Sequence, residues 1–319
     1  MLPLWIDLGQ FALGLLMLVL GADSFVRGAS GLALHFGVSA FVVGLVLVGF
    51  GTSAPELAVN LTATWHGRYA MAVGNVVGSN VANIGLILGI SALIAPLAVR
   101  ARLLRIEAPL VIAVSIVLWL LALDGVLGRI DAALLLTGFV GLMWLVARDA
   151  RQESAAVRAE LAEATATQSD LKRNVIRLAV GLGLLLFGAH KMVGAAVGLA
   201  TAWGMSELMI GLTVVAIGTS LPELAASAMA VWRGHADLAL GNVIGSNLFN
   251  ILLILGITGA VHPLPLDAVS LRIDIPAMIG FALAMYWVVR SDRMVSRREG
   301  IGLLVGYAAF LWLQFVLAG

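Results

Sequence analysis

The sequence contains no cysteine, and only 12% of its 319 residues are charged. Without thiols, disulfide bonds and thiolate metal sites are excluded. A soluble domain carries about 25% charged residues, so the low charge argues against a globular protein in water. The 19 basic and 18 acidic residues leave a net charge of +1, which gives no electrostatic support for nucleic-acid binding.

Apolar residues are abundant instead: they make up 61% of the chain and give it a mean hydropathy of +1.05. A helix that crosses a bilayer needs roughly 20 apolar residues. Ten runs meet this requirement, so we predict an all-α membrane protein with ten transmembrane helices. The predicted spans are residues 4–33, 39–64, 70–95, 103–123, 130–147, 173–200, 205–231, 237–260, 273–290 and 298–318.

One long polar segment divides these spans five and five. We predict a first transmembrane repeat over residues 1–147, a cytoplasmic linker loop over 148–172 and a second repeat over 173–319. Cytoplasmic loops carry an excess of Lys and Arg, and 15 of the 19 basic residues fall on the same side as this linker. The sequence therefore predicts a multi-pass protein of the inner (plasma) membrane with both termini outside.

The chain repeats itself with an offset of 167 residues. Segments 44–90 and 211–257 align without a gap and are identical at 27 of 47 positions. Because each half has five spans, an odd number, the second half must enter the membrane from the opposite side. We therefore predict two inverted five-helix repeats, an arrangement that places binding sites near the middle of the membrane, where broken helices meet.

A polar motif interrupts one span in each repeat, GTSAPE at 51–56 and GTSLPE at 218–223. Proline has no N–H and breaks the helix, which frees main-chain carbonyls. Free carbonyls survive in hydrocarbon only if another group satisfies them. Glu56 and Glu223 are costlier still, since insertion scales assign roughly 2.5–3.5 kcal/mol to an acid in the middle of a membrane. A bound cation would satisfy carbonyls and carboxylates together.

A second motif follows in each repeat, GNVVGSN at 74–80 and GNVIGSN at 241–247. In each repeat the first asparagine and the serine of this motif, and the asparagine four residues after that serine, are spaced at i, i+4 and i+8, so they share one helical face. Combined with the glutamates they would form an all-oxygen cage, which suits Ca²⁺ with its 6–8 oxygen ligands. The motifs hold no imidazole or thiol, which argues against Zn²⁺ or Cu. The residues are Asn75, Ser79 and Asn83, then Asn242, Ser246 and Asn250, with helix packing favoured for Asn75 and Asn242.

Two ionised glutamates would neutralise one divalent ion, and its departure would leave two like charges in a low dielectric. Protons or monovalent cations must then replace it, which is the physical basis of antiport. An H⁺/Ca²⁺ or other divalent-cation antiporter is the nearest alternative to Na⁺/Ca²⁺ exchange. A cation channel is less favoured because the site is built within one chain. An enzyme is disfavoured because no nucleophile–base pair accompanies the acids.

The paired motifs resemble the two α-repeats of the sodium/calcium exchanger family, within the cation/Ca²⁺ antiporter superfamily, and most closely its bacterial ten-helix members. The resemblance covers the architecture from end to end. It implies exchange of Ca²⁺ for Na⁺ by alternating access in a functional monomer. Both ions and the lipid bilayer are then the partners, with the ions as substrates and no cofactor.

The resemblance also implies a set of metal-binding residues. Two glutamates and the main-chain oxygens of two threonines would bind Ca²⁺, four serines would help form flanking Na⁺ sites, and two carbonyls one turn earlier would contribute. These residues are Glu56, Glu223, Thr52, Thr219, Ser53, Ser220, Ser79, Ser246, Gly49 and Ala216, and the shared helical faces add Asn83 and Asn250.

Two further positions bear on the counter-ion. Potassium-dependent relatives tend to carry Asp where this chain has Asn250, which argues against K⁺ co-transport. Proton-coupled relatives usually place an acid soon after the Gly-Asn pair, where Val76 and Val243 stand here. The resemblance therefore favours Na⁺ as the counter-ion.

Overall fold

The computed structural model describes residues 4–100, 102–163, 170–203, 216–291 and 293–318. Nearly all of this part of the chain is helical, and within it nine helices are long and apolar enough to cross a membrane. The prediction of an all-α membrane protein is thus confirmed. The predicted span 205–231 begins outside the described residues, and its remainder forms two helices, α11 (Ala216–Thr219) and α12 (Leu221–Trp232).

The elements occur in two similar series. The first series is α1 (Leu4–Phe36), α2 (Ala40–Val43), η1 (Gly44–Val48), α3 (Gly49–Thr52), α4 (Ala54–Trp65), α5 (Tyr69–Ala82), η2 (Asn83–Leu88), α6 (Gly89–Ile94), β1 (Leu97–Ala98), η3 (Leu103–Glu107), α7 (Ala108–Leu121), η4 (Ala122–Asp124), β2 (Val126–Leu127) and α8 (Arg129–Glu163). The second is α9 (Leu171–Ala202), α11, α12, α13 (Ala236–Phe249), η6 (Asn250–Leu255), α14 (Gly256–Val261), β3 (Leu264–Pro265), η7 (Ser270–Asp274), α15 (Ile275–Ser291), β4 (Met294–Val295) and α16 (Arg297–Ala318).

Helices are interrupted where the prolines of the GTS-x-PE motifs stand. The helical backbone angles are interrupted at Ser53, with φ −82° and ψ 3°, and at Ser220, with φ −90° and ψ 7°. Pro55 and Pro222 follow in the first turns of α4 and α12, where a missing N–H is tolerated. The near-identical angles show that the repeated sequence produces a repeated backbone break.

Wide π-helical turns also recur at the 167-residue offset. Segments η2 and η6 begin at Asn83 and Asn250, and η3 and η7 end at Glu107 and Asp274. Such π-turns are uncommon and concentrate at functional sites. They place both asparagines at a local widening of their spans.

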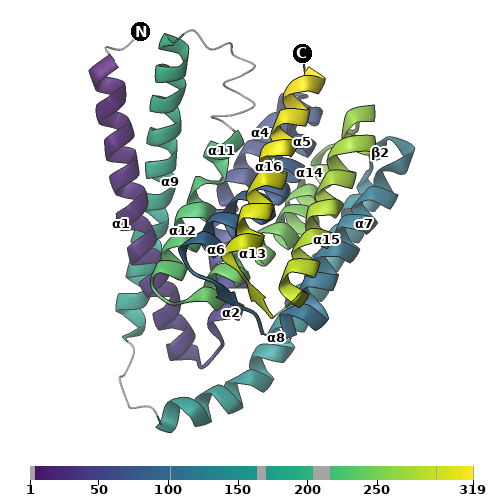
Figure 1. Ribbon diagram of the computed structural model, residues 1–319. Coiled ribbons are helices and arrows are strands. Elements are labelled where there is room, and N and C mark those ends of the chain that lie inside the picture. Colours follow the sequence, from purple (N-terminus) through teal and green to yellow (C-terminus); the bar gives the residue numbers. More distant parts are fainter. Residues whose placement is uncertain (1–3, 101, 164–169, 204–215, 292, 319) are drawn as a thin grey trace.

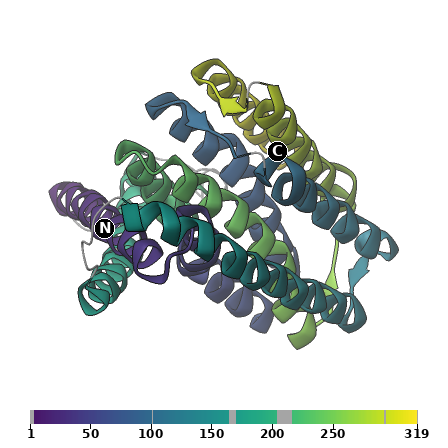
Figure 2. The ribbon, with the colours of Figure 1, turned by 90° about the horizontal axis from the view of Figure 1, so that it is seen from below.

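The first helices of the two series, α1 and α9, pack against each other along one side of the bundle (Figures 1 and 2). Gly14 lies against Gly188 and Gly21 against Gly181, so close that an added Cβ would come within 2.8–2.9 Å of a main-chain oxygen. Because residue numbers rise along one helix as they fall along the other, the two helices are antiparallel. Only glycine permits this approach of two backbones.

Two short ribbons join the halves, one strand from each. Strand β1 pairs antiparallel with β4, and β2 pairs antiparallel with β3. Among the nine spans found in the described residues, the one that starts with α13 is the most enclosed, since 94% of an 18-residue stretch of it is buried, so it forms the middle of the core. Both chain ends lie at the same end of the bundle (Figure 1).

The predicted linker loop over 148–172 is helical in its first part. Helix α8 passes the predicted span end at 147 and continues to Glu163, crossing beneath the bundle (Figures 1 and 2). Residues 148–163 contain no glycine or proline and are rich in Ala, Arg and Glu, which are good helix formers. Hydropathy marks where a span leaves the membrane, but it does not mark where the helix ends.

Candidate ion-binding site

The two helix breaks place the motif glutamates in the protein interior. Glu56 lies in the first turn of α4 and is 1% exposed, and Glu223 lies in the first turn of α12 and is 2% exposed. The Ser53 hydroxyl donates to Glu223 Oε1 at 3.5 Å. In both glutamates Oε2 has no hydrogen-bond partner in the described part of the chain.

The residues before each break differ between the halves. Thr52 is fully buried, and its hydroxyl lies 3.0 Å from the Val48 carbonyl and 3.2 Å from Asn242 Oδ1. Thr219 is half-buried and lines a cavity. Because Pro55 has no N–H, the carbonyl four residues earlier loses its helical donor. That carbonyl belongs to Gly51, which directly precedes Thr52 in the motif.

Helices α5 and α13 present the second motif. Ser79 and Ser246 are 5% and 0% exposed, and Asn83 and Asn250 are each 1% exposed. Asn250 donates through Nδ2 to Asn80 Oδ1 at 3.5 Å, a contact between the two halves. Its Oδ1, Asn83 Oδ1 and Ser246 Oγ have no described hydrogen-bond partner.

Gly49 and Ala216, whose main-chain carbonyls are predicted to contribute to the site, are the first residues of the short helices that precede the breaks. Gly49 begins α3 and is buried against α13, where an added Cβ would lie 3.1 Å from the Ser246 amide nitrogen. This tight contact explains the glycine. Ala216 begins α11, and its side chain lies outside the described residues.

Many buried oxygens of the predicted set are thus unpaired. An unsatisfied buried polar group costs about 1–3 kcal/mol, more if charged, and native proteins contain few of them. In the described chain no three His, Cys, Asp or Glu residues gather into a cluster, so neutral oxygens must provide most of any ion's ligands. The unpaired atoms are Glu56 Oε2, Glu223 Oε2, Ser220 Oγ, Ser246 Oγ, Asn83 Oδ1 and Asn250 Oδ1.

A hydrogen-bonded network around the site was not predicted. Asn75 donates to Asn60 Oδ1 at 2.7 Å, and Asn242 donates to Ser227 Oγ at 2.8 Å and to the Glu223 carbonyl at 3.3 Å. These bonds agree with a packing role for Asn75 and Asn242. Asn60 and Ser227 each follow a motif glutamate by four residues and are themselves 167 apart, which is the signal that could have identified them.

Equivalent glycines of α5 and α13 have different surroundings. A Cβ on Gly241 would collide with the Phe41 carbonyl, and one on Gly245 with the Leu45 carbonyl. On α5, Cβ atoms on Gly74 and Gly78 would have no described atom within 4 Å. The α13 face is therefore sealed against η1 and α2.

The α5 face borders a cavity of about 420 Å³. Its lining includes Asn75, Ser79 and Thr219 from the motifs, and Asp274 and Gln314 from outside them. We call this cavity the vestibule. Since Ser79 and Thr219 belong to the predicted ion site, the vestibule adjoins that site.

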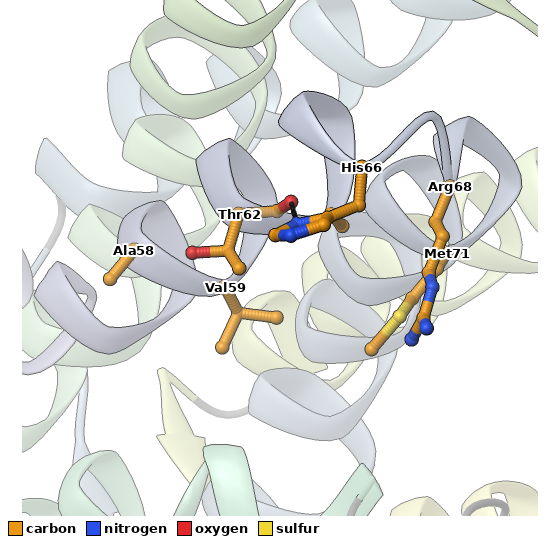
Figure 3. A pocket seen from close by; sticks show the side chains of 7 residues that line it. Ala58, Val59, Thr62, His66, Arg68 and Met71 are labelled. Atoms are coloured by element: carbon orange, nitrogen blue, oxygen red, sulfur yellow. Dashed lines mark hydrogen bonds between the residues drawn. The ribbon is translucent and has the colours of Figure 1, made fainter.

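A neighbouring cavity of about 430 Å³ shares Val59 and Met71 with the vestibule (Figure 3). His66 Nδ1 lies 2.8 Å from the Thr62 carbonyl of its own helix, and Arg68 extends beside Met71. This cavity holds no carboxylate. It adjoins the vestibule at Val59 and Met71.

Comparison with known proteins identifies the family. The profile described as "sodium/calcium exchanger protein" matches residues 6–148 and 174–316, both halves of the chain. The chain belongs to the sodium/calcium exchanger family. This exchanger-family chain is 40% identical to the "putative antiporter CaxA" of Alkalimonas amylolytica, over 95% of this chain and 96% of the relative. It is 32% identical to the sodium/calcium exchanger MaX1 of Methanosarcina acetivorans, over 96% and 97%.

The fold of this family member is also that of a solved exchanger. The sodium-calcium exchanger NCX_Mj, in a structure soaked with zero Na⁺ and Ca²⁺, superposes with a TM-score of 0.83 at 31% identity, covering 96% of this chain and 98% of the other. These relatives are named as exchangers and antiporters, not enzymes. The identification as a multi-pass membrane protein of the cation/Ca²⁺ antiporter group is thus confirmed.

Proposed function

We propose that the protein exchanges Ca²⁺ for Na⁺ across the membrane by alternating access. One observation carries the proposal: glutamates from opposite halves are buried, Ser53 of one half donates to Glu223 of the other, and hydroxyl and amide oxygens of both motifs have no described hydrogen-bond partner. Ca²⁺ takes 6–8 oxygens in flexible geometry, which such a set supplies. The sodium/calcium exchanger relatives support the same ion pair.

The charge balance accounts for obligatory exchange. Glu56 and Glu223 together neutralise one Ca²⁺, whose loss would leave two carboxylates repelling each other in a medium of low dielectric. Na⁺ entering the same oxygens relieves that repulsion. Net movement of one ion without the other is therefore disfavoured, which is the condition for an antiporter.

We further propose ten spans arranged as two inverted repeats. The antiparallel packing of α1 and α9 supports this, as do the equivalent breaks at Ser53 and Ser220. The Lys/Arg bias supports an inner-membrane orientation with termini outside and the 148–172 segment in the cytoplasm. We propose that the monomer is the working unit, because both glutamates come from one chain.

The counter-ion is tested with purified protein in liposomes. Liposomes loaded with Na⁺ and diluted into Na⁺-free medium at equal pH should take up Ca²⁺, and collapse of the Na⁺ gradient by an ionophore should stop the uptake. Uptake that follows an imposed pH gradient and ignores Na⁺ would replace Na⁺ by H⁺ in this proposal. Ca²⁺/Ca²⁺ exchange without net current separates an antiporter from a channel.

A further inference from the structure

We propose that Asp274 captures cations in the vestibule before they reach Glu56 and Glu223, so that the vestibule holds a second, weaker Ca²⁺ site. This inference rests on the proposed function but concerns a residue outside the repeated motifs. The carboxylate lies at the last residue of η7 and is half-buried.

The vestibule connects Asp274 to the motif residues. Asp274 and Gln314 line the same 420 Å³ cavity as Asn75, Ser79 and Thr219. Gln314 donates from Nε2 to Asp274 Oδ1 at 2.5 Å, which holds the carboxylate in place. Gln314 lies near the end of α16, at the end of the bundle where both termini lie (Figure 1). A cation entering from that end meets Asp274 on its way to the glutamates.

Further oxygens border this cavity. Ser79 lines the cavity and is 5% exposed. Asn75 uses its Nδ2 to bind Asn60, which leaves its own Oδ1 available. One carboxylate with hydroxyl and amide oxygens suits a hard cation. A single negative charge makes this site weaker than the paired-glutamate site.

The equivalent acid in the first half is neutralised, whereas Asp274 is not. Glu107, 167 residues earlier, forms an ion pair with Arg102 at 2.8 Å. The position that corresponds to Arg102 is Val269. In the described chain Asp274 forms no ion pair, and its hydrogen-bond partner is the neutral amide of Gln314. No basic side chain of the described residues therefore competes with an entering ion for this carboxylate.

The segments that precede Glu107 and Asp274 carry opposite charges at one pair of equivalent positions. Arg100 binds Asp237 at 2.6 Å, while its equivalent in the second half is Asp267. Fields of one sign in a cleft raise the local concentration of counter-ions and their rate of entry. Capture is accordingly expected at the Asp274 face and not at the Arg102–Glu107 face.

The test is Asp274→Asn, which keeps the acceptor for Gln314 and removes the charge. Ca²⁺ exchange is measured in right-side-out and inside-out membrane vesicles. We expect the KM of Asp274→Asn for Ca²⁺ to rise about threefold or more on one face of the membrane only, with Vmax unchanged. On that face the KM of the wild type should depend more steeply on ionic strength than the KM of the variant. Asp274→Glu should restore the wild-type KM.

Asp124→Asn is the matched control. It removes an equal charge just before β2, at the same end of the bundle, from an exposed residue that does not line the vestibule (Figure 1). Equal KM values for Asp274→Asn, Asp124→Asn and wild type, or a fall in Vmax without a change in KM, would overturn the inference. Absence of Ca²⁺ exchange in the wild type would instead overturn the proposed function.

Discussion

Ser53 and Glu223 belong to opposite halves of the chain, and the hydroxyl of the first donates a hydrogen bond of 3.5 Å to the carboxylate of the second. Thr52 meets Asn242 across the same boundary at 3.2 Å. The helix break of the first half thus contributes to the surroundings of the second half's polar residues. It follows that damage to either half should disable the whole site.

Replacing either motif glutamate by glutamine should nearly abolish Ca²⁺ exchange. Glu56→Gln and Glu223→Gln keep the size of the side chain and remove one of the two charges that neutralise Ca²⁺. The expected loss is about 3 kcal/mol or more, roughly a hundredfold in Ca²⁺ affinity. Isothermal titration with Ca²⁺ and Na⁺-driven uptake measure it, with Asp124→Asn as the control. Wild-type uptake in both glutamine variants would contradict the site.

Asn242 and Asn75 should contribute unequally to stability although they are equivalent in sequence. Asn242 is 1% exposed and contacts Thr52, Ser227 and the Glu223 carbonyl, whereas Asn75 is half-buried and donates one bond. Asn242→Ala leaves several buried groups unpaired, each costing about 1–3 kcal/mol. Thermal unfolding in detergent should show a clearly lower Tm for Asn242→Ala than for Asn75→Ala. Equal Tm values would argue against the hydrogen-bond network.

Gly245 and Gly78 offer a test of the sealed face. In Gly245→Ala the new methyl group collides with the Leu45 main chain, while in Gly78→Ala it meets no described atom. The first change should destabilise the conformation with the α13 face closed and favour its opening. Because the chain has no cysteine, a single Val59→Cys can report on access to the vestibule. Because alternating access closes one side of the protein when the other opens, labelling of Val59→Cys should slow in Gly245→Ala. The labelling rate should stay unchanged in Gly78→Ala. An equal rate in both would contradict the packing argument.

Glu107 and Asp274 should differ in their effect on stability. Glu107 is 4% exposed and paired with Arg102, so Glu107→Gln leaves a partly buried guanidinium without its anion. Breaking such a pair costs about 2–4 kcal/mol at this partial exposure. Asp274 has no ion pair in the described chain, so Asp274→Asn should change the free energy of unfolding by less than about 1 kcal/mol. Unfolding in a denaturing detergent measures both. A larger loss of unfolding free energy for Asp274→Asn than for Glu107→Gln would contradict the assignment of the stabilising ion pair to Glu107.

Much of the fold follows from local sequence. The hydropathy runs locate the nine spans found in the described residues to within a few residues, because 20 apolar residues have few alternatives to a transmembrane helix. Proline in the middle of such a run dictates a break, and Ser53 and Ser220 lie where the sequence places it. The buried glutamates follow from the same reasoning.

Other features depend on tertiary contacts and could not be predicted. Gly74 and Gly241 stand in nearly identical motifs, yet one borders a cavity and the other touches the Phe41 main chain. Identical local sequence cannot specify which face is closed. The helical continuation of α8 to Glu163 is different, because the helix formers of residues 148–163 indicate it and only the hydropathy criterion missed it.

The two ribbons constrain how the chain can be assembled. Strands β1 and β2 are made early, but their partners β4 and β3 lie in the second half. While the first five spans leave the ribosome, β1 and β2 stay unpaired, although strands of two residues offer little edge to other chains. The ribbons between the halves can form only when residues 264–295 have been synthesised. A gene product that stops before them would lack both ribbons, however well its own helices insert.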